Sequence, residues 1–490
     1  RDEAAAHAEN RSDHEEPCDS IRLIVTGSAG VGKSFLIAAI TKLLGARALR
    51  LCAPTGTAAA NIGGSTVNTL LSLKRIKALA GVVDHNDFSA ERRQRLQDRL
   101  HGVRWLILDE YSMVGRVCMA QIDNALRAAG NPEQVLGGFN VVFVGDPGQL
   151  PPVQQAPLHA YQPKRGPFSA LDKIWIHFTD CVQLVQLMRQ QGDDEAAFRA
   201  VLQSLRERKV SRADYDVLKT RVRNVTMSPA DIQRFERAPR LFPTNKGADT
   251  YNEERLLSDA IAAGEPVVHI HARHDGSPAV RRVPAKDAEG LAPVLSIAVG
   301  ARVMIVTNLI TSAGIVNGME AIVRHIVYNE YDSPDTPGTM PRLILVEPIN
   351  ATYTGPSLTD DGPPLIPITP LKRAVTKQNA TTHKEEVIGY RTQFPLRKSW
   401  GWTIHKCQGM TLDLAIVDLG EADFTSGLTY VALSRVRKLT DLLLEPFQWK
   451  RYESVGEGTA AVNFRAELAR IDRLASNTRG RLRARQTAHS

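Results

Sequence analysis

The octapeptide Gly27-Ser28-Ala29-Gly30-Val31-Gly32-Lys33-Ser34 fits the pattern G-x-x-x-x-G-K-[ST]. It lies between an apolar run, Leu23–Thr26, and a helix-like segment, Phe35–Leu44. A glycine-rich turn in this position presents backbone N–H groups at a helix N-terminus, where the helix dipole favours an anion. The sequence therefore predicts a nucleotide phosphate loop built on Gly27, Gly30 and Gly32. The alternative is an ordinary glycine-rich turn.

Lys33 and Ser34 carry the chemistry predicted for this loop: Lys33 reaches the β- and γ-phosphates of ATP, and Ser34 binds Mg²⁺. A site that hydrolyses ATP also needs a second magnesium carboxylate and a group that positions water. Asp109 and Glu110 directly follow the apolar run Leu106–Leu108 and can supply both. We expect Asp109 to hold Mg²⁺ and Glu110 to orient and deprotonate the attacking water.

A third apolar run, Val141–Val144, ends in the loop Gly145–Val153. Gln149 in this loop can hydrogen-bond the γ-phosphate without adding charge, and can thus report whether that phosphate is present. The alternative is a proline-rich loop whose glutamine is merely solvated. The loop by itself leaves both interpretations open.

The short apolar runs between residues 21 and 178 alternate with helix-like segments such as Met119–Ala129. Continuous apolar runs of this length are typical of strands buried on both faces. The pattern predicts an α/β fold with a parallel sheet.

Composition narrows the class of protein. The chain has 490 residues, enough for about three domains. Hydrophobic residues make up 43% and charged residues 23%, which excludes wholesale disorder. No apolar run approaches the roughly 18 residues of a membrane-spanning helix, so no membrane partner is expected. The five cysteines form no C-x-x-C pair, which argues against a structural zinc site and for a reducing compartment.

The formal net charge of +8 is unevenly distributed. Residues 1–19 contain seven acids and two arginines, so the rest of the chain is more basic than the total indicates. A basic body is compatible with a polyanionic partner, although charge alone does not identify one.

The rest of the chain shows three changes of character. Residues 186–257 are mostly helix-like, whereas residues 258–391 contain 13 of the 27 prolines together with short β-rich runs. This composition predicts a small β domain or an insertion. The α/β pattern returns from 392 to 452. A helix-like segment, Ala460–Ser476, then leads to an arginine-rich tail, for which DNA backbone binding, a nuclear address and a solvated, disordered terminus are the alternatives.

Taken in order, seven motifs resemble those of the Pif family of DNA helicases, in the B branch of helicase superfamily one. The resemblance runs from about residue 21 to 450 and rests on Gly27–Ser34, Ala53–Ala59, Asp109–Met113, Gly145–Val153, Met188–Gln190, Thr403–Gly409 and Tyr430–Val436. Three further stretches resemble the helicase portion of Helitron transposons in particular: Gly137–Phe139, Arg391–Leu396 and Leu443–Phe447.

The resemblance implies two RecA-like P-loop domains with ATP between them, a small β-barrel insertion in the second, and 5′ to 3′ translocation on single-stranded DNA. Mapped onto this sequence, it predicts an acidic N-terminal segment (1–20), a first RecA-like ATPase domain (21–185) and a second one (186–257 and 392–452). The inserted β-rich domain is 258–391, and a C-terminal helix with the arginine-rich tail is 453–490.

The resemblance also assigns further residues. Arg189 and Arg435 are similar to the two second-lobe arginines that reach the γ-phosphate; for each alone, a surface salt bridge is the alternative. The implied DNA contacts, suited to phosphates rather than to bases, are Thr55, Gly56, Thr66, Asn68, Asn245, Thr403, His405, Lys406 and Gln408. Trp400 and Trp402 flank the last group, where stacking on a base and packing in the core are the alternatives.

Three departures from the family pattern stand out. Val67-Asn68 replaces the usual Ile-His, and Cys407 replaces the usual Ser, a change this position should tolerate. The glutamine motif that reads adenine in the family is not visible in residues 1–20, so the sequence does not predict adenine selectivity.

The leading hypothesis is an ATP-dependent 5′–3′ DNA helicase that uses ATP and Mg²⁺ and acts on single-stranded DNA and tailed or forked duplexes. The expected settings are genome maintenance (DNA repair, recombination, telomere maintenance) or Helitron transposition, in the nucleus of a eukaryote or in mitochondria, or in a prokaryotic cytoplasm. One alternative is a catalytically decayed, ATP-gated single-stranded DNA clamp. Another is the motor part of a larger transposase, whose cutting activity would lie outside this chain.

Overall fold

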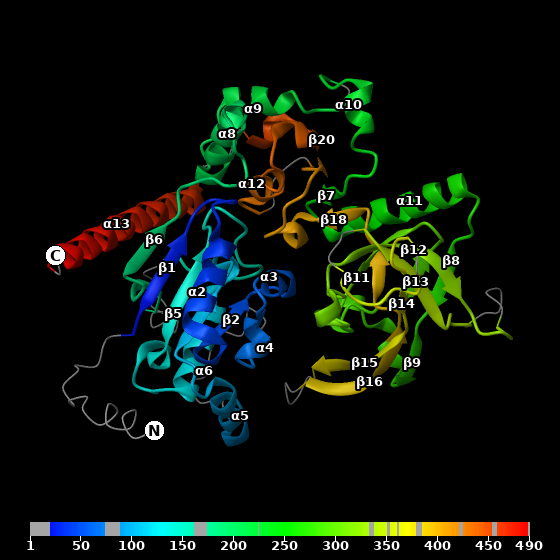
Figure 1. Ribbon diagram of the computed structural model, residues 1–490, viewed down its shortest axis with the longest axis horizontal. Helices are drawn as coiled ribbons and strands as arrows, with labels where there is room; N and C mark the ends of the chain where they lie inside the picture. Colours follow the sequence, from blue (N-terminus) through cyan, green and yellow to red (C-terminus); the bar gives the residue numbers. More distant parts are fainter. Residues whose placement is uncertain are drawn as a thin grey trace. The chain divides into compact units, whose positions relative to one another are not determined.

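The structure is a computed structural model that describes residues 20–73, 89–160, 174–223, 225–332, 338–349, 353–359, 362–378, 385–420, 425–452 and 458–488 (Figure 1). The predicted acidic segment lies outside these residues apart from Ser20. Contacts divide the chain into two compact units, and each is built from separate stretches of sequence. The first unit consists of Arg1–Ser211, Phe424–Tyr430 and Ser454–Ser490, and the second of Arg212–Asp423 and Val431–Glu453.

A six-stranded parallel sheet organises the first unit, in the order β3-β2-β4-β5-β1-β6. The three apolar runs predicted as strands fall in β1, β4 and β5, so this prediction is confirmed. The strands are β1 (Arg22–Thr26), β2 (Leu49–Ala53), β3 (Ser65–Thr66), β4 (Trp105–Leu108), β5 (Asn140–Gly145) and β6 (Asp180–Gln183).

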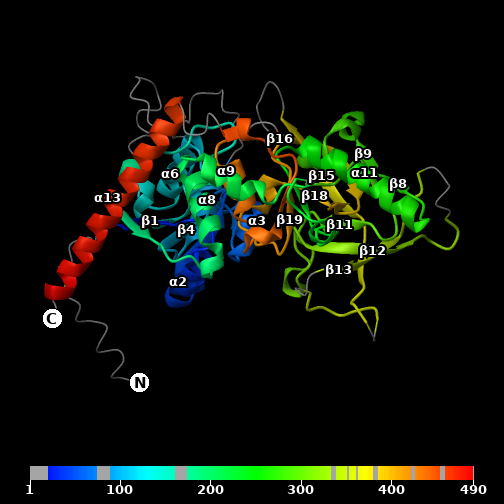
Figure 2. The same cartoon turned by 90° about the horizontal axis from the view of Figure 1, so that it is seen from above.

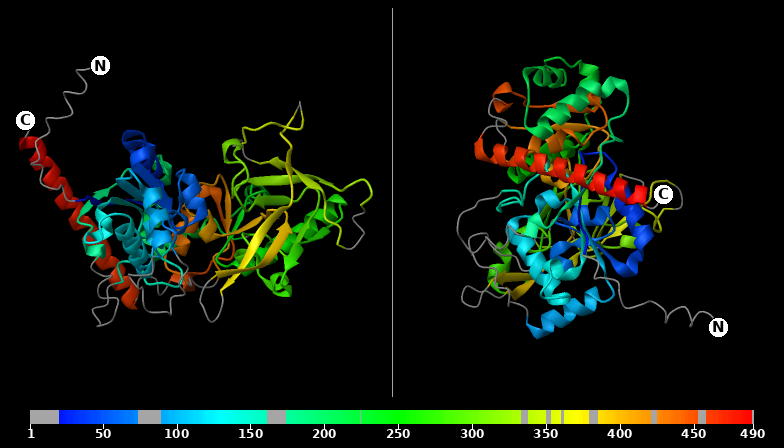
Figure 3. Two further views of the ribbon diagram at one scale, coloured as in Figure 1. Left: turned by 90° about the horizontal axis from the view of Figure 1, so that it is seen from below. Right: turned by 90° about the vertical axis from the view of Figure 1, so that its left-hand side faces the viewer.

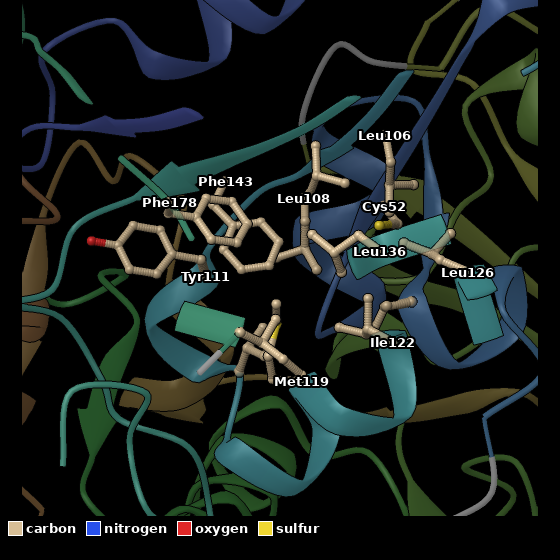
Figure 4. Packing of buried hydrophobic residues seen from close by; sticks show 14 of the residues in the cluster. Cys52, Leu106, Leu108, Tyr111, Met119, Ile122, Leu126, Leu136, Phe143 and Phe178 are labelled. Carbon is tan, nitrogen blue, oxygen red and sulfur yellow. The ribbon is translucent and has the colours of Figure 1, made fainter. Parts of the chain in front are cut away.

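Helices cover both faces of this sheet, which explains why its strands are apolar throughout. Neighbouring side chains on a strand point to opposite faces. Thus Val25 packs with Ile37 of α2, whereas Ile24 joins the cluster formed with α5 and α6. Figure 2 shows α2 and α6 on opposite sides of the strands, and Figure 4 shows part of the second cluster. The helices are α2 (Lys33–Ala48), α3 (Gly56–Asn61), α4 (Val67–Leu70), α5 (Ala90–Leu100), α6 (Arg116–Ala129), α8 (Ala196–Glu207) and α13 (Gly458–Ala488).

The C-terminal helix α13 is longer than predicted. It continues past Ser476 through the arginine-rich segment, so the segment is not disordered, although its residues 481–487 are exposed as a solvated terminus would be. Ile471 and Ala475 belong to the buried cluster of the first unit. The Thr478 hydroxyl accepts a hydrogen bond from the Cys181 amide of β6 at 3.0 Å. Packing against β6 therefore carries the helix beyond its predicted end (Figure 3).

A four-stranded parallel sheet, in the order β18-β7-β19-β20, forms the α/β part of the second unit. Its strands are β7 (Arg240–Phe242), β18 (Gly401–Thr403), β19 (Ala415–Val417) and β20 (Leu442–Leu444). The helices of this unit are α9 (Arg212–Lys219), α10 (Pro229–Gln233), α11 (Asn245–Ala263) and the second half of α12 (Leu428–Leu433). Two α/β parts with parallel sheets agree with the predicted fold class.

The proline-rich stretch is rich in β structure, as its composition predicts. The described strands form a five-stranded sheet (β14-β13-β12-β11-β17), a three-stranded sheet (β15-β16-β9) and a two-stranded sheet (β10-β8), with antiparallel pairing throughout. Closure into a barrel stays a prediction. The strands are β8 (Val268–His271), β9 (Arg273–Gly276), β10 (Val294–Ile297), β11 (Arg302–Ile305), β12 (Glu320–Val327), β13 (Leu343–Pro348), β14 (Ile366–Ile368), β15 (Leu371–Gln378), β16 (Glu385–Gln393) and β17 (Leu396–Lys398).

The contact units differ from the predicted domains at residues 186–211 and at residues 424–430, both of which belong to the first unit. Residues 186–211 were assigned to the second RecA-like domain, but their contacts lie in the first unit. The Met188 amide donates to the carbonyl of Gly30 at 2.8 Å, and Arg206 of α8 pairs with Asp146. These contacts account for the difference at residues 186–211. Among the helices that the structure describes, none is both long and apolar enough to cross a membrane.

Candidate functional site

The predicted phosphate loop lies between the end of β1 and the start of α2, as its sequence requires. Gly30 and Gly32 have φ of 85° and 86°, the left-handed region in which side chains are disfavoured. Lys33 folds back over the loop, and its Nζ donates to the carbonyls of Gly27 (2.8 Å) and Ser28 (2.9 Å). Ser34 is exposed in the first turn of α2. The loop thus has the conformation expected of a phosphate-binding turn.

Asp109 and Glu110 follow β4 at the same edge of the sheet, and both are buried, at 7% and 6% exposure. Glu110 has a left-handed backbone (φ 53°, ψ 45°), and its amide donates to the Asp109 carboxylate at 2.9 Å. Such a conformation is unfavourable for a residue with a side chain and is often found at functional sites. The strained turn holds the two adjacent carboxylates in place.

Charge interactions link these carboxylates to the phosphate loop. Burial lowers the pKa of the Lys33 ammonium, while the charges of Asp146, Glu110 and Asp109 oppose this shift. Burial, together with the Glu110 charge, raises the pKa of Asp109 to about 7. The structure therefore brings Lys33, Asp109 and Glu110 together, as predicted. A buried carboxylate of this kind is suited to binding a cation, which would favour its ionised form.

Gln149 lies in the loop after β5 and is only 3% exposed, so the interpretation as a solvated loop residue is wrong. Its Oε1 has no hydrogen-bond partner among the residues that the structure describes. A buried acceptor without a partner is unfavourable in a closed site and is available to a ligand or a water. The free Oε1 can accept from a water, whereas a contact with the γ-phosphate needs the amide N–H of Gln149, so that predicted contact stays a prediction.

Arg189 lies beside the phosphate loop within the first unit, not in the second part of the chain as predicted. A Cβ placed on Gly30 would lie 2.5 Å from the Cβ of Arg189, so the two backbones are in close contact. Glycine is required at position 30 for this reason as well as for its φ angle.

Arg435 is in the second unit and is 1% exposed, which excludes a surface salt bridge. Its guanidinium donates to the carbonyls of Val431 (2.8 Å), Met410 (3.2 Å) and Cys407 (3.3 Å). The structure thus ties Arg435 to the loop that follows Thr403. Its predicted contact with the γ-phosphate stays a prediction.

The predicted DNA contacts of the first unit follow β2 and β3. The Thr55 hydroxyl caps α3 by accepting from the Ala58 amide at 3.2 Å, and the Thr66 hydroxyl caps α4 by accepting from the Thr69 amide at 3.2 Å. Gly56 and Asn68 are exposed in the first turns of these two helices. Helix N-termini with exposed amides suit phosphate binding.

The predicted contacts of the second unit lie at or just beyond the carboxyl ends of β7 and β18, two paired parallel strands. Asn245 and Lys406 are exposed, whereas Thr403 and Gln408 are buried. Burial lowers the pKa of His405, which therefore favours the neutral imidazole.

The two tryptophans beside this group differ in their surroundings. Trp402 is in the core, and its Nε1 donates to the Ser399 hydroxyl at 2.8 Å. Trp400 packs partly against the core of the β-rich part. Core packing is thus the correct interpretation for Trp402.

Three residues near the phosphate loop had no predicted role: Asp146, Arg206 and Tyr430. The Tyr430 hydroxyl donates to Asp146 Oδ2 at 2.8 Å and accepts from the Ala29 amide at 2.9 Å. Arg206 Nε contacts Asp146 Oδ1 at 2.9 Å. Asp146 could have been suspected because it directly follows a buried strand, but no local pattern marks Arg206.

Comparison with known proteins identifies relatives of this chain. A family model described as PIF1-like helicase matches residues 14–215. The chain is 30% identical over 430 residues to "ATP-dependent DNA helicase PIF1" of Homo sapiens, which covers 87% of this chain and 58% of that protein. It spans about three-fifths of the length of the curated relatives that it matches.

Solved structures give the same result for the fold. The Pif1 helicase of Candida albicans superposes with a TM-score of 0.68 at 25% identity, over 91% of this chain and 96% of that one. The Bacteroides Pif1 helicase "in complex with ADP-AlF3 and ssDNA" superposes with a TM-score of 0.65 at 23% identity, over 95% and 96%. These structures, the relatives and the order of motifs agree, and the chain belongs to the PIF1-like helicase family.

Proposed function

We propose that this chain is an ATP-dependent DNA helicase that moves 5′ to 3′ on single-stranded DNA and unwinds tailed or forked duplexes. The observation that carries the proposal is the group formed by Lys33, Asp109 and Glu110 at one phosphate loop, together with the buried Gln149 in the loop after β5. The names of the relatives support the activity, and the Bacteroides complex supports nucleotide and single-stranded DNA as ligands. The direction of movement rests on the family resemblance.

In the proposed mechanism, Lys33 leaves the loop carbonyls that it now contacts and binds the β- and γ-phosphates of ATP. Glu110 accepts a proton from the attacking water, and Gln149 offers its amide to the γ-phosphate or to that water. Ser34 and Asp109 are the residues that would hold Mg²⁺. The ion would neutralise phosphate charge when bound.

Two arginines complete the proposed ATPase site. Arg435 would stabilise charge that develops on the γ-phosphate, a contribution of roughly 10³ to 10⁵ in rate for an arginine finger. Arg189, beside Gly30, is proposed to contact the same phosphate from the first unit. The DNA strand would contact Thr55, Gly56, Thr66 and Asn68 of the first unit and, in the second unit, Asn245, Thr403, His405, Lys406 and Gln408.

The proposal also covers the cellular process and the compartment in which the helicase works. Work in DNA repair, recombination or telomere maintenance, or in Helitron transposition, in the nucleus or mitochondria of a eukaryote, rests on the resemblance alone. No observation favours the decayed clamp as a second function.

ATP hydrolysis with and without single-stranded DNA, followed by unwinding of 5′-tailed and 3′-tailed duplexes, tests the proposal. We expect DNA-stimulated hydrolysis and unwinding from the 5′ tail only. Lys33→Ala should abolish hydrolysis and leave single-strand binding largely intact, whereas Lys42→Ala, an exposed change on the same helix, should alter neither. DNA binding by the unchanged protein without hydrolysis would favour the clamp instead.

A further inference from the structure

The Ala29 amide of the phosphate loop is bound by a side chain far away in sequence. It donates to the Tyr430 hydroxyl at 2.9 Å, across 401 residues of chain. Tyr430 is 2% exposed and lies in α12. A loop amide that already has a buried partner is not available to a phosphate, so the Ala29 amide has a structural role in the loop.

Asp146 fixes the direction of this hydrogen bond. The Tyr430 hydroxyl donates to Asp146 Oδ2 at 2.8 Å, and its oxygen is therefore free to accept from Ala29. Asp146 Oδ1 accepts from the Gly148 amide at 3.0 Å and from Arg206 at 2.9 Å. Both carboxylate oxygens thus have partners, which a fully buried charge requires.

The protonation states support the same arrangement. Burial, followed by the charge of Asp146, raises the pKa of Tyr430 well above its usual range, so the hydroxyl keeps its proton. Burial opposes ionisation of Asp146, but the charges of Arg206 and Lys33 and the two hydrogen bonds outweigh it and lower its pKa. The tyrosine is the donor and the aspartate the acceptor at neutral pH.

Tight packing holds this group in one position. A Cβ on Gly148 would lie 2.6 Å from Cγ of Arg206, and a Cβ on Gly427 would lie 2.6 Å from the carbonyl oxygen of Gly148. The loop after β5 therefore lies directly against the residues that precede Tyr430. The loop that carries Asp146 is therefore closely packed against α8 and against the segment before Tyr430.

We propose that Tyr430 is a positioning residue whose hydroxyl holds the phosphate loop in its nucleotide-ready conformation by joining Ala29 to the buried Asp146–Arg206 pair. The inference rests on the proposed function for its substrate, ATP. The hydrogen bond from the Ala29 amide to Tyr430 restricts the neighbouring backbone, so less conformational freedom is lost when a nucleotide binds. The hydroxyl touches no reacting atom, so it acts on binding rather than on the chemical step.

The substitution Tyr430→Phe tests the inference because it keeps the ring and removes the hydroxyl. We expect the dissociation constant for fluorescently labelled ADP to rise about tenfold, the effect of losing one hydrogen bond of roughly 1.4 kcal/mol. The KM for ATP should rise similarly, while kcat stays within about threefold. Amide hydrogen exchange of the peptide 27–34 should accelerate in the same variant.

Tyr452→Phe is the matched control, since Tyr452 is equally buried but belongs to the second unit and packs with Tyr215 and Phe447. We expect no change in ADP affinity or in exchange of the phosphate loop. Arg206→Lys is a second variant, which keeps the charge beside Asp146 but alters its geometry, and should weaken ADP binding in the same direction by a smaller factor.

A folded Tyr430→Phe protein with unchanged ADP affinity would overturn the inference, as would equal losses in the Tyr452→Phe control. If Tyr430→Phe does not fold, unchanged ADP affinity in Arg206→Lys would have the same consequence. ADP binding needs no hydrolysis. A wild-type protein that binds ADP but does not hydrolyse ATP would therefore defeat the helicase proposal and leave this comparison valid.

Discussion

Single residues in left-handed conformations shape the loops around the phosphate site. Glu110 is one of them despite its side chain, and Gly427 is another, with φ of 82°. The two positions differ in the room that is available for a side chain. Gly427 lies against the backbone of Gly148 and Gln149, whereas the Glu110 side chain is accommodated in a buried position. A change at Gly427 should therefore displace the loop that carries Gln149.

Gly427→Ala should lower the ATPase rate at least tenfold, because the added Cβ displaces that loop and with it the Gln149 amide. Gly300→Ala is the control, since Gly300 has the same φ of 82° with no atom within 4 Å of the added Cβ. Both changes should cost about 1–2 kcal/mol of stability from backbone strain, and only Gly427→Ala should affect catalysis. The ATPase rate and the free energy of unfolding, measured for both variants, test this prediction. Equal ATPase rates in the two variants would contradict it.

The roles of residues within a local sequence motif could be predicted from the sequence. Contacts between residues that are far apart in the sequence could not. Lys33 and Asp109 each follow an apolar run, so the edge of a parallel sheet brings them together. The pairs Asp146–Arg206 and Asp146–Tyr430 span 60 and 284 residues. Arg189 was placed in the wrong part of the chain because its motif gives an order in sequence and not a contact.

At the scale of elements, α13 and the loop after β5 enclose a cavity of about 250 Å³ in the first unit, lined by Trp175, His159, Arg208 and Glu467 among others. Trp175 Nε1 donates to the Glu467 carboxylate at 3.1 Å, and the Arg208 guanidinium lies over the Phe464 ring. The sequence predicted a helix here but not its burial. Its apolar positions pack on a surface formed by distant strands.

His159 makes this part of the molecule sensitive to acid. Burial, and secondarily the charge of Arg208, lowers the pKa of His159 to about 4 from an ordinary value of 6.5. Between these values the unfolded chain binds a proton that the folded chain does not. The stability of the folded state is therefore complete above pH 6.5 and falls as the pH decreases towards 4, by at most about 1.4 kcal/mol per pH unit.

Urea unfolding at a series of pH values measures this effect as a difference between proteins. His159→Gln should lose less stability than the wild-type protein between pH 6.5 and 4, because glutamine does not titrate. His101→Gln, a change of an exposed histidine, should follow the wild-type curve. Parallel curves for all three proteins would show that His159 is not buried as described.

For the whole molecule, the net charge of +8 is the feature that bears most directly on DNA binding. Binding of single-stranded DNA releases counterions, so the association constant should fall with salt, with a slope of about −0.7 for each phosphate neutralised in a plot of log K against log salt. Lys406→Ala should reduce that slope by about 0.7, while Lys450→Ala, also exposed in the second unit, should not. Equal slopes for the two variants would remove Lys406 from the DNA contacts.

The interleaved course of the chain has a consequence for protease digestion. The first unit takes its structure from three separate stretches, and the last two supply Tyr430 and α13. A single cut in the segment Lys209 to Ser211 would therefore leave the first unit in two peptides, held together by α13 on β6 and by the Tyr430 hydrogen bonds. We expect such a nicked protein to co-elute as one species under native conditions and to separate only in denaturant, and a gene fragment that ends near residue 211 to yield an incomplete core.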